Sequence, residues 1–111
     1  MGDITEIHRA ALMAERAALE DDARRTRDDR RAVELDQQAV GRLSRMDAMA
    51  RQQVAEAAER RRQARARAID AALARIAAGE FGVCTDCGDA IAPRRLDHDP
   101  TVMRCIDCAR G

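Results

Sequence analysis

The sequence GEFGVCTDCGDAIAPRRLDHDPTVMRCIDC, at residues 79–108, contains all four cysteines of the chain. They form two C-x2-C pairs, Cys84/Cys87 and Cys105/Cys108, with 17 residues between the pairs. Two residues between the members of a pair let one tight turn present both sulfurs, and Zn²⁺ binds four thiolates tetrahedrally at about 2.3 Å. The spacer also has the length typical of four-cysteine zinc sites. The sequence therefore predicts one zinc ion bound by Cys84, Cys87, Cys105 and Cys108.

Three other uses of the cysteines are disulfides, a thioredoxin-type redox pair and an iron–sulfur cluster. Residues 1–20 carry charges throughout and lack the apolar core of a signal peptide, so we expect a cytoplasmic protein, where disulfides are rare. No βαβ pattern surrounds either pair, as a thioredoxin-like motif would require. Two symmetric pairs with this spacer favour zinc over an iron–sulfur cluster. We expect His98 to lie in a loop and not to be a ligand.

Four thiolate ligands leave no coordination position for water, so the predicted zinc is structural. No nucleophile–base pair or phosphate-binding loop accompanies it, and we expect no enzymatic activity. The segment after Gly79 has about 31 residues and one aromatic side chain, Phe81, which is too little for a core of its own. Metal binding must therefore supply folding free energy there.

Composition excludes several classes of protein. Of the 111 residues, 36% are charged and only 1% are aromatic, so a β-sandwich, barrel or doubly wound sheet is not expected. No stretch approaches the roughly 18 uncharged apolar residues of a membrane-spanning helix. The 20 basic and 20 acidic residues cancel, which gives no general attraction to nucleic acid or anionic lipid.

Residues 3–78 contain no proline and a single glycine, Gly41, and consist mostly of good helix formers. One continuous helix would leave its apolar stripe bare unless a second chain covered it, whereas an antiparallel hairpin covers the stripe within one chain. We therefore predict a mainly α fold: a long two-helix coiled-coil hairpin at 1–78, its tip within 34–44, followed by a small zinc finger at 79–111. Gly79 is expected to end the second helix. The alternative is a continuous helix in an intermolecular coiled coil.

Apolar residues recur at helical spacing in both predicted helices, and we expect them to face the opposite helix. His8 is expected on the helix surface. The stripe of the first helix comprises Ile4, Ile7, Ala11, Ala14, Ala18 and Leu19. The stripe of the second comprises Val40, Leu43, Met46, Ala50, Val54, Ala57, Ala64, Ala68, Ala72 and Ile76.

The segment from Gly79 to Cys108, with Gly88 after the first cysteine pair and Arg95–Leu96 and Pro100 in the spacer, resembles the C4 zinc-finger signature of the DksA/TraR family. The helical hairpin before it resembles that family's coiled coil. The resemblance implies a bacterial transcription regulator that binds RNA polymerase through its secondary channel. It also implies modulation of initiation, commonly with ppGpp, and no need for sequence-specific DNA binding. We expect a monomer.

The best-known members of that family carry an acidic Asp-x-x-Asp-x-Ala motif at the hairpin tip. This chain has no literal copy, because Glu34 and Gln37 align with the two acidic positions and Ala39 with the alanine, with Asp36 between them. The resemblance therefore implies Glu34 and Asp36 as the tip residues that approach the polymerase active site.

Basic residues on the second helix of family members help to form a ppGpp site at the polymerase interface. By that resemblance Arg61, Arg65, Arg67 and Arg95 are candidates for ppGpp or polymerase contact. In a helix Arg61 and Arg65 share one face. The alternative is that these arginines form an ordinary solvated face.

A second possible function is a zinc-ribbon module that binds nucleic acid or protein, with the helices as a dimerising coil. From Phe81 onward the finger has four Arg and five Asp, and four thiolates with one Zn²⁺ bring its net charge to about −3. Such a surface should repel phosphate.

Overall fold

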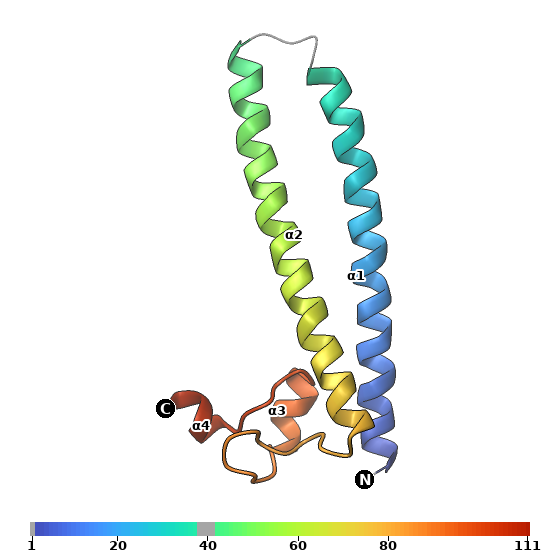
Figure 1. Cartoon of the computed structure of the whole chain (residues 1–111), viewed down its shortest axis with the longest axis vertical. Helices are drawn as coiled ribbons and strands as arrows, with labels where there is room; N and C mark the ends of the chain where they lie inside the picture. Colours follow the sequence, from blue (N-terminus) through green and yellow to red (C-terminus); the bar gives the residue numbers. More distant parts are fainter. Residues whose placement is uncertain (1, 38–41) are drawn as a thin grey trace. The chain divides into compact units, whose positions relative to one another are not determined.

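The computed structural model describes residues 2–37 and 42–111, with the side chains of residues 4–29 and 44–111. Two long helices, α1 (Gly2–Gln37) and α2 (Arg42–Ala77), precede two short ones, α3 (Pro93–His98) and α4 (Ile106–Arg110). The described residues form no strand, and an antiparallel bridge joins Val83 to Ala90. The long helices pack as an antiparallel hairpin (Figure 1), so a single continuous helix is ruled out.

The end of α2 has the backbone pattern that its sequence predicts. Gly79 adopts a φ of +73°, a left-handed conformation that glycine reaches without a side-chain clash. The Gly79 amide donates to the Ile76 carbonyl at 3.1 Å, and the Glu80 amide donates to the Arg75 carbonyl at 2.9 Å. These two bonds form a Schellman motif, which satisfies carbonyls of the last helical turn. The chain therefore leaves α2 at the expected glycine.

The chain divides into two compact units. The finger unit comprises Met1–Arg16 and Arg67–Gly111, and the arm unit comprises Ala17–Ala66. Each unit contains part of both long helices. The finger unit also contains α3, α4 and the four cysteines.

The finger unit contains most of the buried side chains. Leu12 of α1 and Ile69 and Ala72 of α2 have no exposed surface. Arg16 and Asp70 join the two helices through a bidentate ion pair. Arg16 Nε lies 3.0 Å from Asp70 Oδ1, and Arg16 Nη2 lies 3.4 Å from Asp70 Oδ2. Burial of two large aliphatic side chains, oriented by a directional charged contact, fixes how the helix segments of this unit pack.

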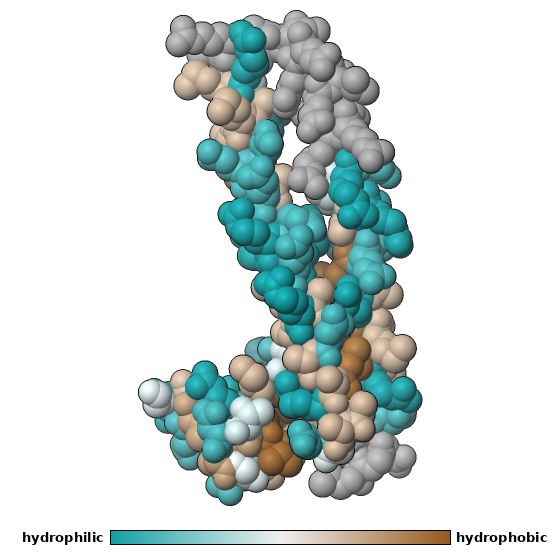
Figure 2. All heavy atoms as spheres, viewed as in Figure 1, coloured by the Kyte–Doolittle hydropathy of each residue, from teal (hydrophilic) through white to brown (hydrophobic). Residues whose placement is uncertain are grey.

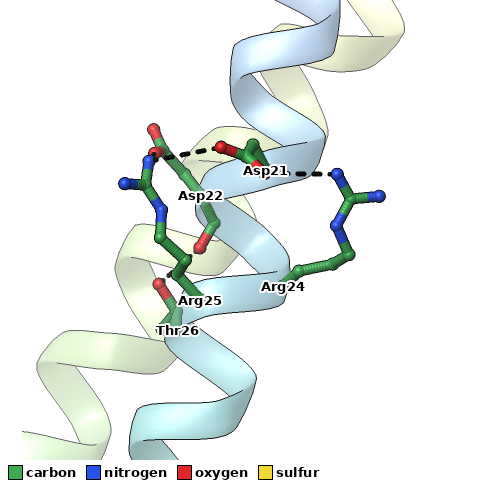
Figure 3. Close-up of polar contacts among 5 residues, drawn as sticks. All are labelled: Asp21, Asp22, Arg24, Arg25 and Thr26. Atoms are coloured by element: carbon green, nitrogen blue, oxygen red, sulfur yellow. Dashed lines mark hydrogen bonds and ion pairs between the residues drawn. The ribbon is translucent and has the colours of Figure 1, made fainter.

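The arm unit is held differently. Among its described side chains only Ala48 is buried. Charged residues of α1 pair along the helix: Arg24 Nη2 lies 3.2 Å from Asp21 Oδ1, and Arg25 pairs with both Asp21 and Asp22 (Figure 3). Acids three or four residues before bases stabilise an α-helix locally. Helix propensity and intrahelical pairs therefore contribute more here than packing between the helices.

The predicted stripes match the structure only in part: most of the first stripe and the N-terminal part of the second are exposed. Ile4 and Ile7 are 58% and 67% exposed, and Met46 and Val54 are 62% and 68% exposed. The inward positions of α1 include Thr5, His8, Leu12, Glu15 and Leu19. Of the predicted stripes, Leu19, Ala57, Ala68, Ala72 and Ile76 are at least half-buried. Val40 and Leu43 lie outside the described side chains.

The error has a physical cause. Alanine occurs on several faces of these helices, and burying one methyl group yields too little free energy to select a face. The larger residues and the ion pairs select it instead.

Candidate metal centre and its support

A tight turn at Cys84–Gly88 and the first turn of α4 bring the four cysteines together. In the first, the Cys84 amide donates to the Asp89 carbonyl at 2.8 Å and the Gly88 amide to the Cys84 carbonyl at 3.0 Å. Gly88 takes a φ of +80°, which lets the chain turn back immediately after Cys87. Cys105 is the residue before α4, and Cys108 lies in that helix. The Thr85 amide donates to the Met103 carbonyl at 2.9 Å and so ties the two turns together.

The four sulfur atoms all lie within 4.8 Å of one another. The Cys87 and Cys105 sulfurs are 3.7 Å apart. A tetrahedral zinc ion with bonds of about 2.3 Å requires sulfurs about 3.8 Å apart, so the arrangement fits one zinc ion. The four-thiol site supports one structural zinc.

The surroundings of the sulfurs shift the pKa values of two cysteines in opposite directions: they favour the thiolate of Cys84 and disfavour that of Cys108. Hydrogen bonds from the backbone amides of Cys87 and Cys105 lower the pKa of Cys84 to about 6. Hydrogen bonds with the sulfurs of Cys105, Cys84 and Cys87 raise the pKa of Cys108. Four thiolates at this distance repel one another, and a divalent cation removes that repulsion.

A small apolar cluster surrounds the site. Cys84, Ile91 and Leu96 are buried, and Phe81 and Val102 pack against them. A side-chain carbon added at Gly82 would lie 3.6 Å from Leu96 Cδ1, and Gly82 itself has a φ of +82°. The Arg95 guanidinium donates to the Arg104 carbonyl at 3.1 Å and so ties α3 to the segment before Cys105. Cys84 belongs to this cluster, and Cys105 and Cys108 pack against it.

His8 joins α1 to the finger, which corrects its expected place on the surface. It is 7% exposed, its ring centroid lies 5.6 Å from that of Phe81, and its Nε2 lies 3.4 Å from Asp97 Oδ1. Phe81 also contacts the cluster that contains Cys84. The sequence contained a weak indication of this contact. His8 lies four residues before Leu12, on the same face of the helix, and Phe81 is the one phenylalanine, tyrosine or tryptophan of the chain.

A second contact holds the finger to the end of α2. The Arg75 guanidinium donates to the Thr101 carbonyl at 3.2 Å, and burial lowers the pKa of Arg75 from its usual value. Thr101 is itself fixed, because its amide and its hydroxyl both donate to Asp99 Oδ1. His98, expected in a loop, is the last residue of α3 and is exposed.

The remaining candidate residues belong to different parts of the chain. The backbone of Glu34 and Asp36 belongs to α1, but their side chains lie outside the described residues, as does the connection 38–41. Arg61 is exposed and Arg65 half-buried in the arm unit; Arg67 is exposed and Arg95 half-buried in the finger unit.

No described helix is long and apolar enough to cross a membrane.

Comparison with known proteins identifies the finger. Residues 79–111 match the family of prokaryotic dksA/traR C4-type zinc fingers. A stretch of 40 residues is 45% identical to the RNA polymerase-binding transcription factor DksA of Haemophilus influenzae. That alignment covers 36% of this chain and 28% of the relative, so the chain matches less than a third of that protein's length.

The whole fold is similar to the solved structure of transcription factor DksA2 from Pseudomonas aeruginosa. The TM-score is 0.85 and the match covers 97% of this chain and 81% of that one, at 24% sequence identity. The hairpin and the finger thus occur together in a known protein. The resemblance read from residues 79–108 is confirmed: residues 79–111 match the prokaryotic dksA/traR C4-type zinc finger, and the fold of the chain is similar to that of DksA2.

Proposed function

We propose that this chain is a cytoplasmic, monomeric transcription regulator that binds RNA polymerase and modulates initiation. The observation that carries the proposal is the combination of a dksA/traR-type finger at residues 79–111 with a hairpin fold similar to that of DksA2 over 97% of the chain. Both relatives are described as transcription factors, and one as RNA polymerase-binding. On this proposal the chain acts by binding, and its zinc is structural rather than catalytic.

Cys84, Cys87, Cys105 and Cys108 would hold that zinc. The ion supplies no chemistry beyond fixing the two turns relative to each other. The protein's own contribution is the apolar cluster of Ile91, Leu96 and Phe81, which covers Cys84 and connects the site to His8. The metal therefore stabilises the packing of the finger against the ends of the two long helices. On this proposal the four cysteines and the apolar cluster maintain the folded surface that the polymerase binds.

We extend the proposal to the hairpin tip. On this view the tip enters the secondary channel of the polymerase and Glu34 and Asp36 approach its active site. Carboxylates near bound metal ions and basic side chains alter local electrostatics strongly, which would change the lifetime of promoter complexes. Two acidic residues at 34 and 36, close to the end of α1 at Gln37, support this part of the proposal.

The first experiment measures binding and effect separately. Purified zinc-loaded chain is titrated against core RNA polymerase, and promoter-complex lifetime is then measured at saturating chain. A Glu34→Ala/Asp36→Ala variant should bind within about threefold of the wild type and lose the effect on lifetime, since alanine maintains the helix. Failure of the wild-type chain to bind would refute the proposed function, and full regulation by the bound variant would refute the tip mechanism alone.

Arg61, Arg65, Arg67 and Arg95 remain our candidates for contact with ppGpp or the polymerase. Guanidinium groups bind phosphate oxygens in a bidentate manner, and Arg61 and Arg67 are exposed. At saturating chain, Arg61→Ala or Arg67→Ala should reduce any additional effect of ppGpp on promoter-complex lifetime. Arg27→Ala, an exposed arginine of α1, is the matched control. An unchanged ppGpp effect in both variants would remove Arg61 and Arg67 from this role.

A further inference from the structure

The side of α2 that faces α1 in the arm unit carries charged residues where a coiled coil usually has apolar ones. Ala48, Ala55 and Arg62 follow one another at intervals of seven residues, which places them in one row of a coiled-coil seam. Ala48 is buried and the other two are half-buried, and α1 is the other helix of this unit. Arg65, three residues after Arg62, is also half-buried and lies in the adjacent row of the seam. The seam therefore changes from alanine to arginine along α2.

Arg62 has a counter-charge on its own helix. Its Nη2 lies 2.6 Å from Glu59 Oε2 and its Nε lies 3.1 Å from the same oxygen. The side chains of Arg62 and Glu59 are only 19% and 23% exposed. The half-buried residues that α1 contributes to the described part of the arm unit are all uncharged: Leu19, Ala23 and Thr26. Charge in this seam thus comes from α2.

Glu59, Arg62 and Arg65, which we call the polar layer, have a formal net charge of +1. Partly buried charges cost desolvation free energy, and apolar side chains of similar size often give equal or higher stability. Polar residues in a coiled-coil seam instead select which helices pair and how many. The choice of partner helix is therefore the property on which the polar layer should act.

The two helices of the arm unit carry opposite net charge. Residues 17–29 of α1 contain five acids and three bases, a net charge of −2. Residues 44–66 of α2 contain three acids and six bases, a net charge of +3, and hydrophilic residues (teal) cover much of the visible face of α2 in Figure 2. Pairing of α1 with α2 is therefore electrostatically favourable, whereas two copies of α2 repel each other.

From these observations we propose that the polar layer excludes a second copy of this chain as the partner of α2. Beside α1, the layer meets uncharged half-buried side chains on a helix of net negative charge. In a parallel pair of α2 helices, equivalent positions face each other, so Arg62 and Arg65 of both copies would share one seam. Like charges placed together in an interface strongly disfavour it. The proposal rests on the monomeric state that we propose for the chain, and not on polymerase binding.

Sedimentation of the full zinc-loaded chain tests this exclusion. The wild type should remain monomeric at about 100 μM. Glu59→Gln/Arg62→Leu/Arg65→Leu removes the polar layer and should lower the dissociation constant of a dimer at least about 100-fold. The Glu59→Gln change avoids leaving a half-buried carboxylate without its arginine. Arg65→Leu alone keeps the ion pair intact and should lower the constant about tenfold, which tests the proposal even if the triple variant folds poorly.

A matched control makes the same changes on the exposed side of α2. Glu56→Gln/Arg60→Leu/Arg61→Leu alters the net charge and the apolar content by the same amounts, and all three positions are exposed. This variant should sediment like the wild type. Far-UV circular dichroism and zinc content confirm that each variant is folded.

The outcomes separate this inference from the proposed function. Dimers formed by the polar-layer variants, with a monomeric wild type and a monomeric control, support the exclusion. If Arg65→Leu and the folded triple variant stay monomeric, the exclusion is refuted and the proposed function stands. Equal dimerisation of the control also overturns it, because any added leucine would then suffice. A dimeric wild type refutes both this inference and the monomeric state, whereas failure to bind polymerase refutes the proposed function alone.

Discussion

The finger unit and the arm unit use the same two helices but are stabilised in different ways. In the finger unit, Leu12, Ile69 and His8 are buried and the cysteine site packs beside them through Phe81. In the arm unit, one small residue is buried among those described, and ion pairs such as Arg24–Asp21 act within a helix. The comparison shows that burial is concentrated in the finger unit, whereas Met46, Met49 and Val54 of the arm unit are exposed.

Loss of the metal should produce the largest difference in stability between the two units. A Cys105→Ser variant, or treatment with a strong chelator, should release one equivalent of zinc and unfold residues 79–111. Because His8 packs on Phe81, amide protection should also fall in residues 4–16, while residues 17–29 retain wild-type exchange. Metal analysis and hydrogen exchange measure both effects. Zinc content below about half an equivalent in the wild type would contradict the predicted site.

Core truncation should cost more free energy in the finger unit than in the arm unit. Leu12→Ala removes a fully buried side chain and should lower the free energy of unfolding by about 3 kcal/mol. Val54→Ala removes an exposed side chain of the arm and should change it by less than about 0.5 kcal/mol. Urea unfolding followed by circular dichroism gives both values. Equal losses would mean that the arm is packed as tightly as the finger unit.

The contact between α1 and the finger has an intermediate expected effect. His8→Ala should destabilise the protein by about 1–2 kcal/mol, because it removes the ring against Phe81 and the partner of Asp97. Ile7→Ala, at the neighbouring exposed position, is the control. The Asp97→Asn variant then separates ring packing from the polar contact. If His8→Ala unfolds like Ile7→Ala, the finger is not held through this histidine.

Removing the ion pairs of the arm should have the smallest effect. Arg24→Gln/Arg25→Gln should lower the local stability of α1 by about 0.5 kcal/mol at low salt, since exposed i,i+3 and i,i+4 pairs are individually weak. The difference from wild type should shrink in 1 M salt, where screening removes most of the attraction. Hydrogen exchange across residues 17–29 measures it. A difference that persists at high salt would show that these arginines act through packing.

Sequence reasoning succeeded where a residue type has one structural use. Cysteine pairs at this spacing predicted the four-thiol cluster, and a glycine after a long alanine-rich segment predicted the end of α2. It succeeded only in part on which face of each helix points inward: Ala72 and Ile76 of α2 are inward as predicted, but alanine fits any face and the inward positions of α1 include Thr5 and His8. The contact between His8 and Phe81 joins residues far apart in the chain and depends on tertiary packing, which periodicity does not encode.

Hydrogen exchange of the zinc-loaded chain, alone and bound to core RNA polymerase, tests the division between the two units most directly. Alone, the amides of residues 4–16 and 67–77 should exchange slowly and those of residues 44–61 faster, because burial is concentrated in the finger unit. Binding should slow exchange strongly in residues 44–61 and change the helix segments of the finger unit little. Protection that appears only in the finger unit, or no change in residues 44–61, would contradict the proposal that the hairpin enters the channel of the polymerase.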